Sequence, residues 1–317
     1  MPRLLLPALL LAPAWAAAQS LPAYVPVTPV LASRSALYAQ PVVPRHDGWR
    51  IAVVADYTNA IEQTTAVDRR EFLLDAELLQ VDLWLVRDLS PEWFVTANVA
   101  MRSAHDGMLD SFLNWYHDLI GLKVPARNRR PIDTYGWTVE LHELDLDTAR
   151  ESAFRGDARL GVGHRIGPAQ LVASITLPTA TASGEHWSRG TVGTALAGTA
   201  RFVDNSRVIL EAGLTAGHTP SHGELAAYQR EWFVGGQAGF RWRVIGRQAL
   251  FATLFAQSAS WRDTGFAAMD DPEFTIDFGG LIRLGRNWPA LQLGMTEDLL
   301  PRGPAVDAGF KVGVHWE

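Results

Sequence analysis

Hydrophobic and polar residues alternate most regularly between residues 231 and 244. The apolar positions of this segment are Trp232, Val234, Gly236, Ala238, Phe240, Trp242 and Val244, and except for Phe233 the positions between them are polar or glycine. A period of two indicates a β-strand whose two faces meet different surroundings. Trp232 and Trp242 share one face, and a tilted strand of that length spans about 25 Å, which is the height of the apolar band of a membrane.

The same alternation recurs along most of the chain. It is clear in segments 273–285 and 306–316 and weaker in segments that begin near Trp49, Trp93, Asp157, Gln170, Thr191, Arg207, Ala249 and Ala290. In segment 72–87 the apolar phase changes at Leu78 and Leu79, which predicts a β-bulge. Most segments run over about 10 to 14 residues, whereas sandwich strands typically have about 5 to 6. Strand length therefore favours a membrane barrel over a soluble periplasmic β-sandwich.

The connections between these segments alternate in length. Tight connections are expected near Leu89, Gly167, Asn205, Gly246 and Asn287, and longer ones near 58–70, 104–156, 179–190, 218–230, 262–272 and 300–305. Outer-membrane barrels show this alternation, with short periplasmic turns and long outer loops. The sequence therefore predicts an all-β fold, an antiparallel transmembrane β-barrel of about twelve strands. Segment 134–143 also alternates, and we place it in the long loop or as an extension of a neighbouring strand.

The N-terminus has the features of a secretory signal peptide. Arg3 precedes the apolar run 4–11, and small residues at 16–18 offer a cleavage site. We expect a cleaved signal peptide at 1–18, a proline-rich periplasmic lead-in segment at 19–48 and an outer-membrane barrel at 49–317. No later stretch approaches the roughly 20 apolar residues that a spanning helix needs. The expected location is the outer membrane of a Gram-negative bacterium.

Composition narrows the possible chemistry. The chain has no cysteine, although export leads to a compartment where disulfides form, so a closed sheet is one source of its stability. The formal net charge of −6 gives no hint of a nucleic-acid partner, which would favour a basic patch. The nine histidines are scattered, so we expect no metal site, and we predict no cofactor.

Charged residues on the polar faces of the strands are expected to line the lumen. They are Asp75, Glu77, Asp82, Arg102, Asp157, Arg159, Arg165, Arg201, Arg207, Glu211, Glu231, Arg241, Arg243, Glu273, Asp277, Arg283, Asp307 and Lys311. Opposite charges in a confined space should pair, because a buried unpaired charge is costly. A barrel of this size lies between small filled barrels and wide porins. We therefore expect a mostly occluded lumen, with either a narrow polar path or ion pairs that only stabilise the barrel.

Residues 110–120 are predicted to form an amphipathic helix in the longest loop. Polar residues Asp110, Ser111, Asn114, His117 and Asp118 share one arc, apolar residues fill the opposite one, and Gly121 suits the helix end. We expect this helix and the basic residues Arg127, Arg129 and Arg130 to fold over or into the barrel mouth. There they would act as a plug or gate, or only as a structural cap.

A hydrolytic site is not supported by the same helix. Ser111 and His117 lie about 120° apart around the helix axis, too far for the direct hydrogen bond that a nucleophile and its base require. We therefore assign no catalytic residue and expect no enzyme.

The chain also resembles a family of uncharacterised outer-membrane β-barrel proteins of Gram-negative bacteria, a domain of unknown function. The most specific match is a D-S-F-x3-Y/F-H-D-x2-G-L motif, here Asp110-Ser111-Phe112, Tyr116-His117-Asp118 and Gly121-Leu122, followed by Arg127. Further matches are 74–77, 156–157, 177–179 and 297–299, followed by Pro304 and Asp307. The resemblance implies fold and location but no activity.

Three functions follow as alternatives. The leading one is a narrow channel for small polar or amphipathic solutes, closed by the loop helix. The second is a structural barrel for envelope integrity, and the third, least supported, is a lipid-modifying enzyme. The expected partners are outer-membrane lipid, the barrel-assembly machinery and, for a channel, a small solute.

Overall fold

The computed structural model describes residues 25–32, 34, 40–66, 68–121, 127–142, 144–182, 187–285, 288–300, 303–304 and 306–316. The predicted signal peptide, residues 1–18, lies outside the described residues. Among the described residues, no helix is both long and apolar enough to cross a membrane.

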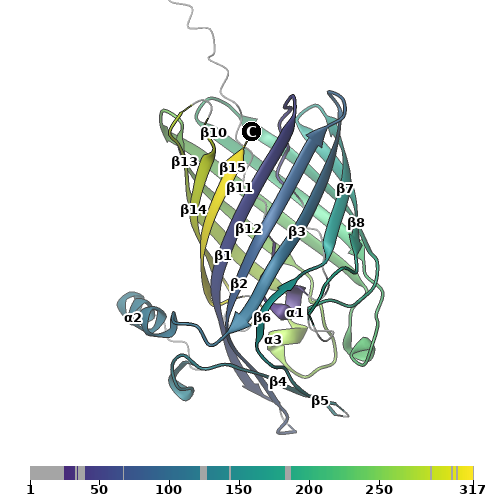
Figure 1. The fold of residues 1–317 in the computed structure, drawn as a ribbon, viewed down its shortest axis with the longest axis vertical. Coiled ribbons are helices and arrows are strands. Elements are labelled where there is room, and N and C mark those ends of the chain that lie inside the picture. The colour runs from purple at the N-terminus through teal and green to yellow at the C-terminus, as the bar shows by residue number, and fades with distance from the viewer. Residues whose placement is uncertain are drawn as a thin grey trace, which may run out of the picture.

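The elements are strands with a few short helices (Figure 1). In chain order they are α1 (Pro29–Ala32), β1 (Trp49–Thr65), β2 (Glu71–Asp88), β3 (Trp93–His105), α2 (Asp110–Ile120), η1 (Arg127–Arg129), β4 (Gly136–Glu140), β5 (Asp145–Asp147), β6 (Glu151–Arg155), β7 (Ala158–Ile166), β8 (Ala169–Leu177), β9 (Gly193–Asp204), β10 (Val208–His218), η2 (Ala226–Tyr228), β11 (Trp232–Ile245), β12 (Gln248–Gln257), α3 (Ala267–Asp270), β13 (Glu273–Arg283), β14 (Ala290–Asp298) and β15 (Ala308–Trp316).

The strands close into an antiparallel barrel of 12 strands, as the sequence predicted. Closure is made by β1 and β15, which pair from Ile51 opposite Trp316 to Asn59 opposite Ala308. Strands β6 and β7 occupy one place in the wall, since both pair with β3 at different heights. Strand β4 pairs with the far end of β2, and β5 pairs with β4, so segment 134–143 extends a neighbouring strand.

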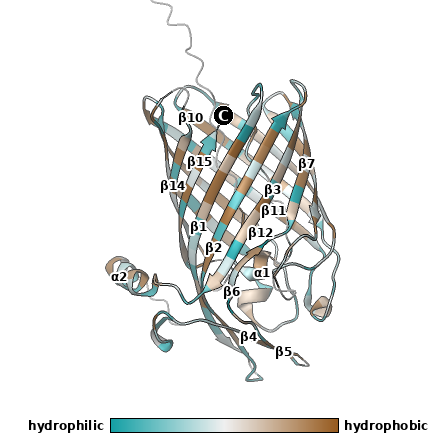
Figure 2. Cartoon of the chain, in the orientation of Figure 1, coloured by the Kyte–Doolittle hydropathy of each residue, from teal (hydrophilic) through white to brown (hydrophobic). Residues whose placement is uncertain are grey.

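The two ends of the barrel differ. The tight turns and the last strand end at the top of Figure 1, and the long connections, α2 and α3 lie at the bottom. Because outer-membrane barrels have short periplasmic turns, we refer to these as the periplasmic and extracellular ends. Exposed tryptophans ring the periplasmic end at Trp49, Trp93, Trp242, Trp288 and Trp316. The alternation of apolar and polar residues along the strands is visible in Figure 2.

The change of phase in β2 is not a bulge, and that prediction is wrong. The ladder between β1 and β2 runs without a register shift from Trp49 opposite Arg87 to Thr65 opposite Glu71. On the periplasmic side of Leu78 the next lumenal positions are the polar Gln80 and Asp82, but on its extracellular side Phe72, Leu74 and Ala76 point inward and are buried. The strand stays regular. What changes near Leu78 is what each face contacts: toward the extracellular end the inward face meets apolar side chains and the outward face meets polar groups.

The extracellular end of the lumen is filled by an apolar cluster. Its members come from the wall, from inward-folded loops and from α1; they include Val27, Val30, Ala60, Phe72, Leu74, Leu78, Trp137, Phe154, Trp187, Leu225, Trp261, Phe266 and Met269. We call this group the extracellular apolar cluster. It closes that mouth of the barrel by burying apolar side chains that would otherwise meet water.

Candidate functional site

The lumen is occupied by the chain's own N-terminal residues 25–32, 34 and 40–43. Residues 44–48 lead from it to β1 at the periplasmic end, where Arg45, Asp47 and Gly48 are exposed. We call residues 25–32, 34 and 40–48 together the lumenal segment. Val25 packs against Trp84 toward the periplasmic end. The helix α1 then belongs to the extracellular apolar cluster, where the Trp261 indole N–H donates to the Val30 carbonyl at 2.8 Å. The chain next runs back, and the His46 N–H donates to Asp88 at 2.9 Å. The segment is therefore a U whose two limbs both lead toward the periplasmic end.

Side chains of the wall satisfy the backbone of the returning limb. The Gln170 amide donates to the carbonyls of Gln40 and Pro41 at 3.1 and 2.9 Å and accepts from the Val43 N–H at 2.8 Å. The Thr199 hydroxyl donates to Gln40 at 2.6 Å. These bonds replace the ladder that an extended segment would otherwise need, because buried backbone groups require partners.

Arg34 fixes the segment nearer the extracellular end. Its guanidinium donates to the carbonyls of Ser258 and Ala259, both at 3.2 Å, and to the Gln257 side chain, and it stacks over the Phe233 ring at 4.6 Å. Sequence reasoning missed this role, because an arginine in a proline-rich stretch shows no periodicity. The available signal was the set of valines between residues 25 and 43, which an exposed linker does not need.

The expectation of a periplasmic lead-in is therefore corrected for the described part of residues 19–48. It lies within the barrel because its valines gain apolar contacts there and its backbone finds hydrogen-bond partners on the wall.

Charges on the lumenal wall pair as expected. Lys311 lies 2.7 Å from Asp277 and 3.4 Å from Asp56, three buried groups on three strands. Arg201 meets Glu211 at 3.3 Å and also donates to the Val42 carbonyl of the lumenal segment. Other predicted lumenal residues are also buried in the wall; they are Asp82, Arg102, Asp157, Arg159, Arg241, Glu273 and Arg283, with Arg165 and Arg243 half-buried nearer the periplasmic end.

Five residues assigned to the lumen lie elsewhere, and one of them, Asp307, precedes β15 on the outside of the barrel. Asp75 and Glu77 point away from the lumen, because they alternate with the inward-facing Leu74 and Ala76 along a regular ladder. Arg207 and Glu231 lie in connections next to strand ends and are exposed. The polar-to-lumen rule fails in β2 because the extracellular apolar cluster, not water, fills the barrel at that height.

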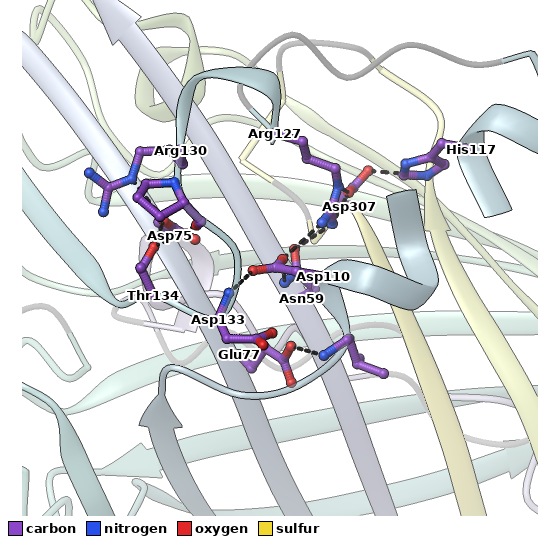
Figure 3. A network of polar contacts seen from close by, with 12 residues as sticks. Asn59, Asp75, Glu77, Asp110, His117, Arg127, Arg130, Asp133, Thr134 and Asp307 are labelled. Carbon is purple, nitrogen blue, oxygen red and sulfur yellow. Dashed lines mark hydrogen bonds and ion pairs between the residues drawn. The ribbon is translucent and has the colours of Figure 1, made fainter. Parts of the chain in front are cut away.

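A second polar cluster lies on the outside of the barrel at its extracellular end (Figure 3). Arg127 donates to Asn59 at 2.6 Å, to Asp110 at 2.9 Å and to Asp307 at 2.5 Å, and His117 lies 3.8 Å from Asp307. We call these five residues the outer clamp. It joins β1, the residue before β15, α2 and η1 across the seam at which the barrel closes.

Neighbouring contacts extend the outer clamp along β2. Arg130 donates to Asp75 at 2.8 Å, the Thr134 hydroxyl donates to the same carboxylate at 2.9 Å, and Glu77 accepts from the Leu109 N–H. The carboxylates predicted for the lumen thus hold the long loop from outside. Of the other residues predicted for a gate, Asn114 is half-buried and Arg129 is exposed.

Helix α2 forms at the predicted residues and ends at Gly121, whose φ of 73° is in the left-handed region. Its predicted position over the mouth is wrong. Figure 1 shows it beside the barrel, and its Phe112 ring lies 5.6 Å from Phe310, which faces outward on β15. The polar arc fits the outside of the rim because Asn59, Asp75 and Glu77 present polar groups there.

The site offers little for catalysis or metal binding. Ser111 is exposed while His117 is buried against Asp307, and burial lowers the pKa of that imidazole. In the part of the chain that the structure describes, no group of three or more His, Cys, Asp or Glu side chains could hold a metal ion.

The closed wall and its filled lumen define an outer-membrane β-barrel plugged by its own N-terminal segment. The chain belongs to the family of proteins of unknown function DUF3187, which matches residues 35–317. No curated protein is detectably similar to it in sequence.

Solved structures share the fold. An outer membrane channel from Pseudomonas putida F1 superposes with a TM-score of 0.55 at 13% identity, covering 88% of this chain and 97% of that chain. The NanC porin covers 84% of this chain and 99% of its own at 7% identity and a TM-score of 0.46. The P. putida toluene transporter TodX covers 92% of both chains at 9% identity and a TM-score of 0.45. At these identities the likeness concerns architecture, and the two weaker matches add no argument.

Proposed function

We propose that the protein is an outer-membrane channel for small polar or amphipathic solutes, and that its resting state is closed by the lumenal segment. The observation that carries this proposal is the way the segment is held. Within the described part of the chain, no strand ladder includes residues 25–48. The segment is held by apolar contacts and by separate hydrogen bonds, each worth about 0.5 to 1.5 kcal/mol net between neutral groups and about 1.5 to 3 kcal/mol where one partner is charged, as at Arg34.

The shape of the segment supports displacement. Both limbs of the U lead to the periplasmic end, so the segment can leave the lumen without opening the wall. The barrel itself is held by continuous ladders on every strand. Movement of the segment therefore breaks side-chain contacts but no strand ladder, whereas movement of any strand would open the wall.

The lining of the lumen supports the solute class. A molecule entering from outside would first meet the extracellular apolar cluster and then the charged belt around Lys311, Arg201 and Arg159. A solute with both apolar and polar parts, or a small polar one, matches that order of surfaces. The P. putida F1 structure that shares the fold is described as an outer membrane channel, which agrees with a transport role.

A reversible lock tests the proposal. The chain has no cysteine, so a cysteine pair at Val43 and Val172, members of one apolar cluster, would tether the segment to β8. The matched control is a pair at Val53 and Val314, which face each other across the β1–β15 seam on the outside. Liposome swelling and planar-bilayer conductance are measured before and after reduction.

The channel proposal predicts that the oxidised Val43–Val172 lock lowers solute flux and that reduction restores it, while the seam crosslink changes nothing. Flux that persists in the locked protein would contradict movement of the segment. The second candidate is a structural barrel, favoured by the tightly filled extracellular cluster. It would be supported if the wild type carries no flux under any condition while deletion of residues 25–48 lowers thermal stability.

A further inference from the structure

Helix α2 presents three different sides. One side is buried against the barrel through Asp110, Leu113 and His117. A second side, with Ser111 and Asp118, is polar and exposed. The third is an exposed apolar edge made of Phe112, Trp115 and Leu119, which lie within an arc of about 60° at 100° per residue.

The apolar edge is unusually open for a helix that packs on a protein surface. The exposed fractions are 40% for Phe112, 60% for Trp115 and 68% for Leu119, and Met108 just before the helix is 75% exposed. Folding has placed these side chains outward while the outer clamp fixes the opposite side. Exposed apolar groups held together in one patch usually mark a surface that contacts something apolar.

The position of the helix shows what that contact is. Phe112 lies against Phe310, and toward the periplasmic end from Phe310 the outward positions of β15 continue with the exposed Val312. Tyr116 interacts with the outward-facing Glu297 of β14. The apolar edge of α2 is therefore continuous with the lipid-facing wall and lies at its extracellular limit.

The wall itself is polar at this height on the same side of the barrel. Asn59 on β1, Glu77 on β2 and Glu297 on β14 point outward there. On β11, by contrast, Trp232 stands at the extracellular end of the strand and is 73% exposed. Aromatic residues ring both boundaries of a membrane barrel. Near the seam the outward aromatic residues at that boundary are Tyr57 of β1 and Phe310 of β15, which face each other, and α2 adds Phe112 and Trp115 beside them.

We infer that α2 is a membrane-interface helix that inserts Phe112, Trp115 and Leu119 among the lipids of the outer leaflet and extends the extracellular aromatic girdle beside the β1–β15 seam. The lipid surface is favoured over a protein partner because the apolar edge continues the lipid-facing wall. Interfacial helices have this combination of a polar side and an aromatic apolar side. The inference depends on the barrel fold and not on the proposed channel activity.

Nitroxide labels test this directly in the full chain, which has no native cysteine. Trp115→Cys and Leu119→Cys place a label on the apolar edge, and Ser111→Cys places one on the exposed polar side of the same helix. Each variant is folded into phosphatidylcholine vesicles, its folding is checked by heat-modifiable gel mobility, and collisions with oxygen and with a water-soluble nickel chelate are measured.

Oxygen collisions should exceed nickel collisions at 115 and 119, and the order should reverse at 111. Nickel accessibility equal at all three positions would place the helix in water and overturn the inference. Labels at 115 and 119 that neither reagent reaches would show a protein cover instead. A second readout avoids bulky labels: acyl chains brominated near the headgroup should quench less of the total fluorescence in Trp115→Phe than in the wild type. Equal quenching in the two proteins would also overturn the inference.

Discussion

Lys311 is the cation that neutralises two carboxylates of the charged belt of the lumen. It is the partner of both Asp56 and Asp277, and all three are buried. Lys311→Met leaves two carboxylates close together without their cation, which typically costs about 3 to 5 kcal/mol. We expect a loss of that order in the free energy of unfolding, measured by urea titration in lipid vesicles.

The matched control for Lys311→Met adds Asp56→Asn and Asp277→Asn. The triple variant removes all the charges together, so it should recover most of the lost stability. If Lys311→Met alone is as stable as the wild type, water in the lumen screens the two carboxylates from each other.

His117 gives the outer clamp a dependence on pH. Burial lowers its pKa below the usual value of 6.5, and Arg127 adds to this, while Asp307 and Asp118 oppose it. As the pH falls below about 6.5, the unfolded chain binds a proton more readily than the folded one, so the stability contributed by neutral His117 is progressively lost. The stability of the wild type relative to His117→Gln should therefore decline between pH 7.5 and 5, measured by urea unfolding. A relative stability that rises on acidification would mean that the pair with Asp307 dominates.

At the scale of elements, Arg127 is the side chain that joins η1 to both α2 and the barrel wall. Arg127 contacts Asn59, Asp110 and Asp307, whereas Arg129, two residues on, is exposed. Arg127→Ala should release the loop, because it leaves two carboxylates unpaired, and Arg129→Ala should not. Limited proteolysis of the loop, followed by mass spectrometry, reads this out while gel mobility reports an intact barrel. Equal cleavage of both variants would show that α2 is held by its apolar contacts alone.

Elements were also where sequence reasoning was strongest. Alternation is a local property, so β11, β13 and β15 could be predicted from side chains alone, and Gly121 predicted the end of α2. The outward orientation of Asp75 and Glu77 could not be predicted, because it depends on which groups fill the barrel at that height. The position of the lumenal segment was hidden for the same reason. Its partners, such as Gln170 and Ser258, lie far away in the sequence.

For the molecule as a whole, the sequence had assigned closure of the lumen to the loop that carries α2, but the structure places closure and α2 in different parts of the barrel. The lumen is closed by the lumenal segment and the extracellular apolar cluster, while α2 lies outside the wall. Deleting residues 108–130 should therefore leave single-channel conductance unchanged and lower thermal stability, since the outer clamp is lost. A rise in conductance in the deletion variant would instead support the gate that the sequence predicted for this loop.

The U shape of the lumenal segment makes it a ligand that the barrel carries on its own chain. The lumenal segment continues directly into β1 at Trp49, and the His46 N–H is hydrogen-bonded to Asp88 of the wall. After the segment leaves the lumen, it therefore stays within reach of its binding site there. Tethering of this kind gives effective concentrations of the order of millimolar. Each opening would therefore be short, and a free peptide of the same sequence would compete with the tethered segment only at comparable concentrations. The time the barrel spends open is then set by the length of that tether as much as by the contacts inside.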